Sequence, residues 1–280
     1  MSYGKHQSFY LKKHWITKGI LSIIEDSGIF LNNEGYKRLG IGKNMQQSLR
    51  YWLEASNISE YDKENKEHTL TYFGNKIYDY DLSCSNPITL LIIQYFIVNK
   101  LEGNGPFSHS FAYLFNEFEN YYLSKDQLKK ELFTYSNNSV AENTINKDVD
   151  CLIQTYTNKT MKHPEDKNVS LLSALDLIIK DDEYYYKKAL DINKFTSLGI
   201  LFLISFENHQ NKMPLQLDNI TSKIGKAFNL RRSNIIDALD VCSNLGFNVQ
   251  IIRTNNLDIV TIGESYDNLL DTIYLRSEEL

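Results

Sequence analysis

Few residues of this 280-residue chain combine the types and spacing that catalysis needs, and most of them are acidic. Asp148 and Asp150 lie two residues apart on a predicted helix, and Glu117 and Glu119 have the same spacing. Metal-dependent nucleases use converging carboxylates to hold Mg²⁺ against a phosphate. Side chains two residues apart on a helix point about 200° apart, so each pair supplies at most one ligand to a site completed from elsewhere. Surface solvation or structural pairing is the alternative interpretation.

His6 is the histidine best placed for acid–base chemistry, because it lies in a basic, aromatic segment with Phe9, Tyr10 and Lys12. Histidine titrates near neutral pH and can accept or donate a proton in catalysis. We therefore take His6, Asp148 and Asp150 as candidate catalytic residues of a site that cleaves a phosphodiester. Such a site would need Mg²⁺ or Mn²⁺, for which the pattern names no ligand set.

Other familiar chemistry is excluded by the absence of its motifs. The sequence contains no GxxxxGK[ST] loop, no GxGxxG after a strand, no HExxH and no GxSxG. Cys84, Cys151 and Cys242 are odd in number and far apart, and neither they nor the six histidines have zinc-site spacing. No apolar run reaches the roughly 18 residues of a membrane span, and the first residues lack a signal-peptide core. These features predict a soluble cytoplasmic protein with reduced thiols.

Charge is distributed unevenly along the chain. The whole sequence has a net charge of −5, yet residues 1–51 contain eight Lys or Arg and only three Asp or Glu. A basic end on an acidic body is a plausible binding surface for a polyanion, because the local field decides where phosphates dock. Chance clustering of surface lysines is the alternative.

The first part of the chain has the pattern of a winged helix-turn-helix. We predict helices over 15–25, from about 33, and over 43–56, with a tight turn at Gly40-Ile41-Gly42 before the third. Two short strands around residues 58–60 and 68–72 follow. The third helix has a buried stripe of Met45, Leu49, Trp52 and Leu53. Its other side is predicted to present the polar residues Lys43, Asn44, Gln46, Gln47, Arg50 and Tyr51.

Helix three of a winged helix enters the major groove, where Arg can bind guanine and Asn or Gln can bind adenine. The sequence therefore predicts duplex DNA binding by this helix, assisted by Lys12 and Lys13. The alternative is a fold of the same kind that contacts only proteins. Glu54 and an acidic loop over residues 62–67 argue for that alternative.

The rest of the chain is predicted to be helical, with small hairpins. Residues 87–98 are apolar on nearly all sides and predict the central core helix, and the aromatic residues of 107–122 predict a packing surface. Helices are expected over 125–135 and 144–156, followed by a polar linker over 158–168. We place domain boundaries to give a winged helix-turn-helix (1–82), a central helical region (83–160) and a C-terminal α/β-hairpin region (161–280).

A second winged helix is a hypothesis for the C-terminal region. Helices over 217–228 and 231–245 precede a predicted hairpin, 247–253 and 257–262, around a turn at 254–256. Arg231 and Arg232 at a helix start could hold phosphate, but Asp237 and Asp240 further along would repel it. We favour a packing or homodimer role for this helix over direct reading of DNA.

Several ordered blocks of the sequence resemble a bacterial domain-of-unknown-function family. They are residues 4–12 and 15–19, the RLGIGKNM and SLRYWLEA blocks at 38–45 and 48–55, and residues 70–74, 115–118 and 147–151. The sequence departs from the family at Gln7, usually Glu, and at Tyr10, usually Pro. Members of this SspB-like family occur in DNA phosphorothioation and anti-phage defence clusters. The resemblance implies a DNA-nicking component that opens one strand for sulfur incorporation.

Two functions follow as hypotheses. The first is a phosphorothioation component that binds double-stranded DNA and nicks it with other phosphorothioation proteins. The second is a non-catalytic DNA-binding adaptor that recruits the modification enzymes, and a protein scaffold without nucleic acid is a weaker third. The residues expected to contact DNA are Lys12, Lys13, Lys43, Asn44, Gln47, Arg50, Tyr51, Arg231 and Arg232.

Overall fold

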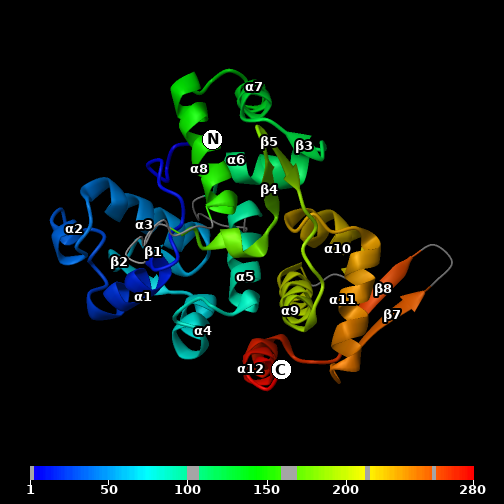
Figure 1. The fold of residues 1–280 in the computed structure, drawn as a ribbon. Helices are drawn as coiled ribbons and strands as arrows, with labels where there is room; N and C mark the ends of the chain where they lie inside the picture. Colours follow the sequence, from blue (N-terminus) through cyan, green and yellow to red (C-terminus); the bar gives the residue numbers. More distant parts are fainter. Residues whose placement is uncertain (1–2, 100–106, 159–168, 212–214, 254–256) are drawn as a thin grey trace.

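The computed structural model describes residues 3–99, 107–158, 169–211, 215–253 and 257–280. Within these ranges the chain is mainly helical, with three small antiparallel sheets (Figure 1). This confirms the fold class that the sequence predicts at the level of mainly α structure with small hairpins. Among the helices of these ranges, none combines the length and hydrophobicity of a bilayer-crossing segment.

The N-terminal part has the predicted order of helix, helix, tight turn, helix and hairpin. Its elements are α1 (Trp15–Glu25), α2 (Gly35–Arg38), α3 (Lys43–Ala55), β1 (Ser59–Asp62), β2 (Glu67–Leu70) and α4 (Tyr72–Tyr80). Strands β1 and β2 pair antiparallel, with Ser59 opposite Leu70 and Asp62 opposite Glu67. Gly40 has φ +61°, a left-handed backbone that glycine adopts without a steric penalty. The tight turn expected before α3 is therefore confirmed.

Helix α3 is buried over a wider face than its sequence predicts. Leu49, Trp52 and Leu53 are fully buried, as expected. The expectation that Gln46 and Tyr51 face solvent is wrong, because both side chains are buried. The cause is contact on two sides: α3 packs against α1 and α2, and Trp52 Nε1 donates to the carbonyl of Phe9 in the N-terminal segment at 2.8 Å.

The central part surrounds helix α5, whose residues from Ile88 to Val98 are all buried, as predicted. Its elements are α5 (Pro87–Val98), α6 (His109–Ala112), the π-helical turn η1 (Tyr113–Glu117), β3 (Tyr122–Leu123), α7 (Lys125–Tyr135), α8 (Glu142–Thr157), the 3₁₀ turn η2 (Leu172–Leu175), β4 (Ile178–Asp181) and β5 (Tyr184–Lys187). Asn86 caps α5 by accepting the Ile88 N–H at 3.0 Å. The three strands form a sheet in the order β3–β5–β4.

The C-terminal part pairs a helical layer with the third sheet. Its elements are α9 (Lys194–Asn211), β6 (Leu215–Gln216), α10 (Leu217–Ile220), the π-helical turn η3 (Thr221–Gly225), α11 (Arg232–Asn244), β7 (Val249–Arg253), β8 (Asp258–Ile262) and α12 (Tyr266–Ser277). The residue patterns did not identify a helix over 194–211. The structure has α9 there, packed against both α5 and α11. The predicted hairpin is β7–β8, in the sheet order β6–β8–β7. Its turn at 254–256, and all but Asn158 of the predicted linker, lie outside the described residues.

Candidate nucleic-acid interface

A polar groove of about 530 Å³ runs along the outer side of α3. Its walls come from α3, from the segment before α2 and from the N-terminal turn. It is lined by Lys5, Gln7, Phe30, Leu31, Asn32, Asn33, Lys43, Gln46, Gln47, Arg50, Tyr51 and Glu54. Three of these side chains are cationic, whereas Glu54 is the single carboxylate among them. The groove is therefore a positively charged recess rich in amide groups.

The exposed residues of α3 supply most of the groups that could contact a polyanion. Lys43, Gln47 and Arg50 line the groove and are exposed, and Asn44 is exposed beside them. Lys5 and Gln7, from the opposite wall, are also exposed. From sequence, Lys5 was identifiable only as one of the cations of the basic N-terminal part. Its position next to His6 was the available signal, but the fold was needed to place it opposite α3.

The N-terminal turn that carries Lys5 and Gln7 is anchored to α8 by buried polar contacts. The backbone N–H of Gly4 donates to Asp148 Oδ1 at 2.8 Å, and His6 Nε2 lies 3.0 Å from the same oxygen. The Ser8 N–H donates to His6 Nδ1 at 3.1 Å, which leaves the ring proton on Nε2, facing the carboxylate. Gly4, Gln7 and Ser8 all have φ between +50° and +69°, so the turn is tight.

His6 and Asp148, two of the candidate catalytic residues, are thus brought together from positions 142 residues apart, but neither reaches solvent. Both side chains are 1% exposed, and Asp148 Oδ2 also accepts the Ser110 hydroxyl at 2.9 Å. The His6 ring stacks on Trp52 with 6.0 Å between centroids. Because each oxygen of the carboxylate accepts a hydrogen bond from inside the protein, this pair anchors the turn that carries Lys5 and Gln7.

Asp150 does not join this pair. It lies on the outer side of α8, where its Oδ1 is 2.6 Å from Lys125 Nζ. The divergence of Asp148 and Asp150 agrees with their two-residue spacing on a helix. Glu117 and Glu119 are both exposed. The carboxylates considered from sequence therefore do not converge.

Tyr51 separates the buried pair from the groove. Its ring lies edge-on to His6, with 6.2 Å between centroids, and its side chain is 6% exposed. Burial raises the pKa of the Tyr51 hydroxyl far above its usual value, partly offset by a hydrogen bond with Ser108. Tyr51 therefore forms the floor of the groove as a neutral phenol.

Glu54, a half-buried acid of the groove lining, lies beside the buried histidine His68. Glu54 Oε1 is 3.4 Å from Arg50 Nε and 3.8 Å from His68 Nδ1 on strand β2. Burial raises the pKa of Glu54, and the positive charge of Arg50 offsets part of this rise. Burial, assisted by Arg50, lowers the pKa of His68 to about 4. His68 is consequently neutral near pH 7, and Glu54 is the local negative charge.

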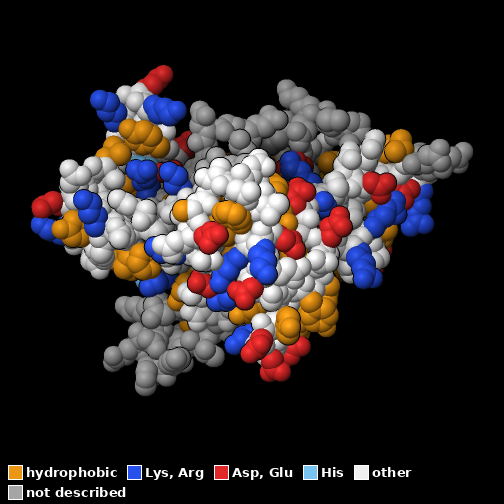
Figure 2. Space-filling model, turned by 90° about the horizontal axis from the view of Figure 1, so that it is seen from above, with side chains coloured by type: hydrophobic (Ala, Val, Ile, Leu, Met, Phe, Trp, Pro, Cys, Tyr) orange, Lys and Arg blue, Asp and Glu red, His pale blue; other side chains and the backbone are white. Residues whose placement is uncertain are grey.

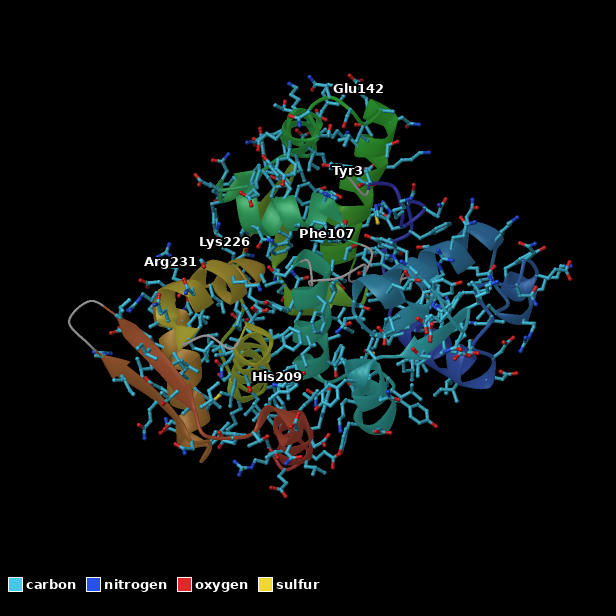
Figure 3. All side chains as sticks on the ribbon, turned by 180° about the vertical axis from the view of Figure 1, so that it is seen from behind. Tyr3, Phe107, Glu142, His209, Lys226 and Arg231 are labelled. Carbon is cyan, nitrogen blue, oxygen red and sulfur yellow. The ribbon has the colours of Figure 1, made fainter. Side chains whose placement is uncertain are left out.

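The remaining sequence-predicted DNA contacts lie away from the groove. Lys13 is exposed and Lys12 is half-buried with Nζ 5.6 Å from the Trp15 ring, but neither lines the recess. Arg232 is 3.0 Å from Asp218 and 2.6 Å from Asp258. Arg231 is exposed at the start of α11, on the opposite side of the molecule from α3 (Figures 1 and 3).

Metal-ligating side chains do not gather in the described part of the chain. No group of three or more His, Cys, Asp or Glu there could hold an ion, and the three cysteines are buried and free. Mg²⁺ prefers carboxylates together with waters and substrate phosphates. The groove offers one carboxylate, and Glu54 is already paired with Arg50. The donors present do not fit a preassembled magnesium site.

Comparison with known proteins agrees with the resemblance seen in the sequence blocks. A family model described as a protein of unknown function (DUF4007) matches residues 3–275. Two solved structures have the same fold with a TM-score of 0.83, and each alignment covers 99% of this chain and 88% of the other. They are the SspB crystal structure, at 18% identity, and SspB with a bound magnesium ion, at 17%. Among curated proteins, none matches the sequence.

Proposed function

The chain belongs to the DUF4007 family, and we propose that it binds duplex DNA through the α3 groove as a component of a DNA phosphorothioation system. The observation that carries this proposal is the groove itself. Lys43, Gln47 and Arg50 of one helix line it together with Lys5, and among its described lining residues Glu54 is the one carboxylate. Lysine and arginine neutralise phosphates, and amide side chains can read base edges.

The order of elements supports the same proposal. Helices α1, α2 and α3 followed by the β1–β2 hairpin occur in the order expected of a winged helix-turn-helix, a fold in which the third helix enters the major groove. Lys43 and Asn44 lie in the first turn of α3, the part of a recognition helix that approaches bases. The likeness to SspB supports the phosphorothioation setting and association with other proteins of such a system.

The geometry favours binding without cleavage by this chain alone. His6 and Asp148 are enclosed, Asp150 is elsewhere, and the groove lacks converging carboxylates. We therefore place the adaptor function first. Nicking is the second candidate, favoured by the overall likeness to an SspB structure that contains magnesium.

One pair of measurements tests both candidates. Fluorescence anisotropy with a labelled duplex should show binding that weakens steeply as salt rises from about 50 to 200 mM, since phosphate contacts release counterions. Incubation of supercoiled plasmid with Mg²⁺ or Mn²⁺ should give no open-circular product. Absence of binding at low salt would refute the proposed interface. Metal-dependent nicking that survives repurification would make the nickase function the correct one.

A further inference from the structure

The small sheet β3–β5–β4 has an exposed face of tyrosines that the DNA interface does not use. The aromatic residues of 107–122 were predicted to pack inside, and Phe111, Phe115 and Phe118 do so. Tyr121 and Tyr122, in contrast, are 54% and 57% exposed. Tyr184 on β5 is also 57% exposed. We call the surface formed by Tyr121, Tyr122, Tyr184 and Tyr186 the tyrosine face.

Strand register explains how these side chains gather. Tyr122 of β3 is opposite Tyr186 of β5, and Tyr184 of β5 is opposite Asp181 of β4. Side chains alternate along a strand, so Tyr184 and Tyr186 share the outer side while Tyr185 is buried on the inner side. The sheet therefore presents neighbouring rings to solvent from two strands.

Three rings of this face, those of Tyr121, Tyr122 and Tyr186, contact one another. Tyr121 stacks on Tyr186 with 5.6 Å between centroids and 24° between planes. Tyr121 also meets Tyr122 edge-on at 4.9 Å. Tyrosine is enriched at protein interfaces, since it adds contact area with little conformational freedom to lose. An exposed cluster of this kind is typical of a binding surface.

The exposed charges of the β4–β5 hairpin and of the segment just before β3 are mainly negative, and the nearby Lys226 donates to the Asn116 carbonyl. Glu119, Asp181, Asp182 and Glu183 are exposed, and within the described residues none of them is ion-paired. Lys180 is the exposed cation on this hairpin. Lys187 is directed inward, where it donates to the Phe118 carbonyl and its Nζ is 5.3 Å from the Phe118 ring, and Lys188 pairs with Asp191. The upper side of the molecule as a whole mixes both signs of charge with apolar side chains (Figure 2).

We propose that the tyrosine face docks an arginine- or lysine-rich segment of a partner protein. Cationic side chains are attracted to aromatic faces, and the surrounding carboxylates add a complementary field. The same carboxylates would repel the phosphates of a nucleic acid. A second copy of this chain, joined through the same face, would bring two acidic rims together. The sheet is well separated from α3, so DNA and this partner can bind together (Figure 1).

The test uses the full chain and a fluorescein-labelled peptide of alternating arginine and glycine as the probe. We expect Tyr121→Ala/Tyr122→Ala to weaken peptide binding by about tenfold, since two ring faces are lost. Asp181→Asn/Asp182→Asn should weaken it several-fold. Tyr78→Ala, at a tyrosine 44% exposed on α4, and Asp237→Asn/Asp240→Asn on α11 are the matched controls and should leave affinity unchanged.

Each contrary outcome overturns the proposal. Absence of measurable peptide binding does so directly. Equal weakening by the α11 control shows a general attraction of cations to an acidic protein. If labelled oligo-dT binds and loses affinity in Tyr121→Ala/Tyr122→Ala, the face binds single-stranded nucleic acid instead. The substituted side chains are exposed, so the variants are expected to fold. Unchanged far-ultraviolet circular dichroism checks this expectation.

Discussion

Two parts of the molecule each place helices before an antiparallel hairpin, and they differ in surface chemistry. The α3 region, residues 15–70, has three helices and then the β1–β2 hairpin. The α11 region, residues 194–262, has α9, α10 and α11 before β7–β8, with strand β6 and the turn η3 between its helices. The outer side of α3 exposes Lys43, Asn44, Gln47 and Arg50. The outer side of α11 exposes Asp237 and Asp240. Helices followed by a hairpin therefore do not by themselves imply one kind of ligand.

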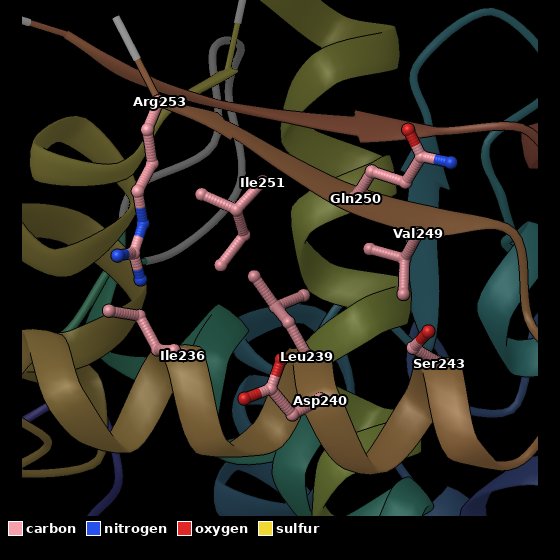
Figure 4. Close-up of a pocket in the computed structure, with 8 residues that line it drawn as sticks. All are labelled: Ile236, Leu239, Asp240, Ser243, Val249, Gln250, Ile251 and Arg253. Carbon is pink, nitrogen blue, oxygen red and sulfur yellow. The ribbon is translucent and has the colours of Figure 1, made fainter. Parts of the chain in front are cut away.

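The recesses beside the two helices show the same contrast. The pocket between α11 and β7 measures about 410 Å³ and has Ile236, Leu239 and Ile251 directed into it, with Asp240 and Arg253 nearby (Figure 4). Four of its eight lining side chains are aliphatic, and its one acid and one arginine balance in charge, whereas the α3 groove has three cations and one carboxylate. This lack of excess positive charge agrees with the packing or dimer role that the sequence predicted for α11. We retain that role as a proposal.

Of the substitutions proposed, Asp148→Ala should produce the largest effect. Asp148 lies on α8, but it anchors the turn that forms part of the α3 groove. The substitution leaves the Gly4 N–H and the Ser110 hydroxyl unpartnered in the interior beside His6. Loss of one partner of such a buried polar group costs about 3 kcal/mol. Urea unfolding should show this loss of unfolding free energy. DNA affinity should fall as well, because the turn with Lys5 loses its anchor.

Asp150→Ala is the matched control for that experiment. It removes a carboxylate of the same helix that is 47% exposed and paired only with Lys125. Surface pairs contribute about 0–1 kcal/mol, so stability should change little. An Asp148→Ala protein as stable as Asp150→Ala would contradict the anchoring role. Loss of plasmid nicking in Asp148→Ala without loss of stability would restore Asp148 as a catalytic candidate.

Lys43→Ala/Arg50→Ala should have the next largest effect, about 10- to 100-fold weaker duplex binding at low salt. Both side chains are exposed, so the fold should be retained. The slope of log affinity against log salt should decrease by nearly two, since two phosphate contacts are lost. Anisotropy titrations over a range of salt measure both quantities.

A matched double substitution in the α11 region is the control. It tests whether the α11 region also contributes to DNA affinity. Arg231→Ala/Arg253→Ala removes two exposed arginines without touching the α3 groove. DNA affinity should change by less than about twofold, within the general effect of net charge. A loss equal to that of Lys43→Ala/Arg50→Ala would show that DNA contacts both regions.

Local periodicity predicted most elements of both regions. The stripe of Leu49, Trp52 and Leu53, the turn at Gly40 and the buried helix α5 all follow from patterns within one segment. Helix α9 is buried against α5 and α11, so it lacks the amphipathic periodicity that identifies surface helices. Helix α5 is also apolar on most sides but has Pro87 to mark its start, whereas no proline marks the start of α9, which was missed. The exposure of α3 was also misjudged at Gln46, because its amide donates to the carbonyl of Ile29 in the segment before α2, a contact that helical periodicity does not reveal.

The residue types of the candidate site were predictable from the sequence, but the way in which the fold brings them together was not. The basic character of α3 is visible in its residues, whereas the opposite wall, with Lys5 and Gln7, required the fold. His6 and Asp148 were both singled out, and the structure does join them, but their burial depends on Trp52, Ser110 and the turn at Gly4. The residue types of His6 and Asp148 indicated catalysis. Long-range packing instead buries both side chains, where they support the N-terminal turn.

Glu54→Gln should strengthen duplex binding by about threefold at neutral pH, because it removes the negative charge of the α3 groove at a half-shielded position. The pKa of Glu54 is raised by burial, so wild-type affinity should increase as pH falls through that raised value. The variant should lack this increase. The raised pKa also means that the stability contribution of Glu54 is present below the usual glutamate pKa and is lost as pH rises through the folded-state value.

Anisotropy titrations across acidic to neutral pH check this prediction. Glu60→Gln, at an exposed carboxylate on β1 outside the groove lining, is the control and should leave the pH profile unchanged. A wild-type profile that is flat, or equally steep in Glu54→Gln, would assign the pH response to another group.

Arg232→Ala should have the smallest effect and completes the comparison with Arg50. Arg232 occupies the start of α11, but its guanidinium bridges Asp218 before α11 and Asp258 on β8, and both carboxylates raise its pKa. A guanidinium held by two carboxylates has little net attraction for a phosphate. DNA affinity should therefore stay within about twofold of wild type, whereas Arg50→Ala alone should weaken it several-fold. If Arg232→Ala instead weakens binding as much as Arg50→Ala, the acidic partners of Arg232 exchange for DNA, and the α11 region reads the duplex despite Asp237 and Asp240.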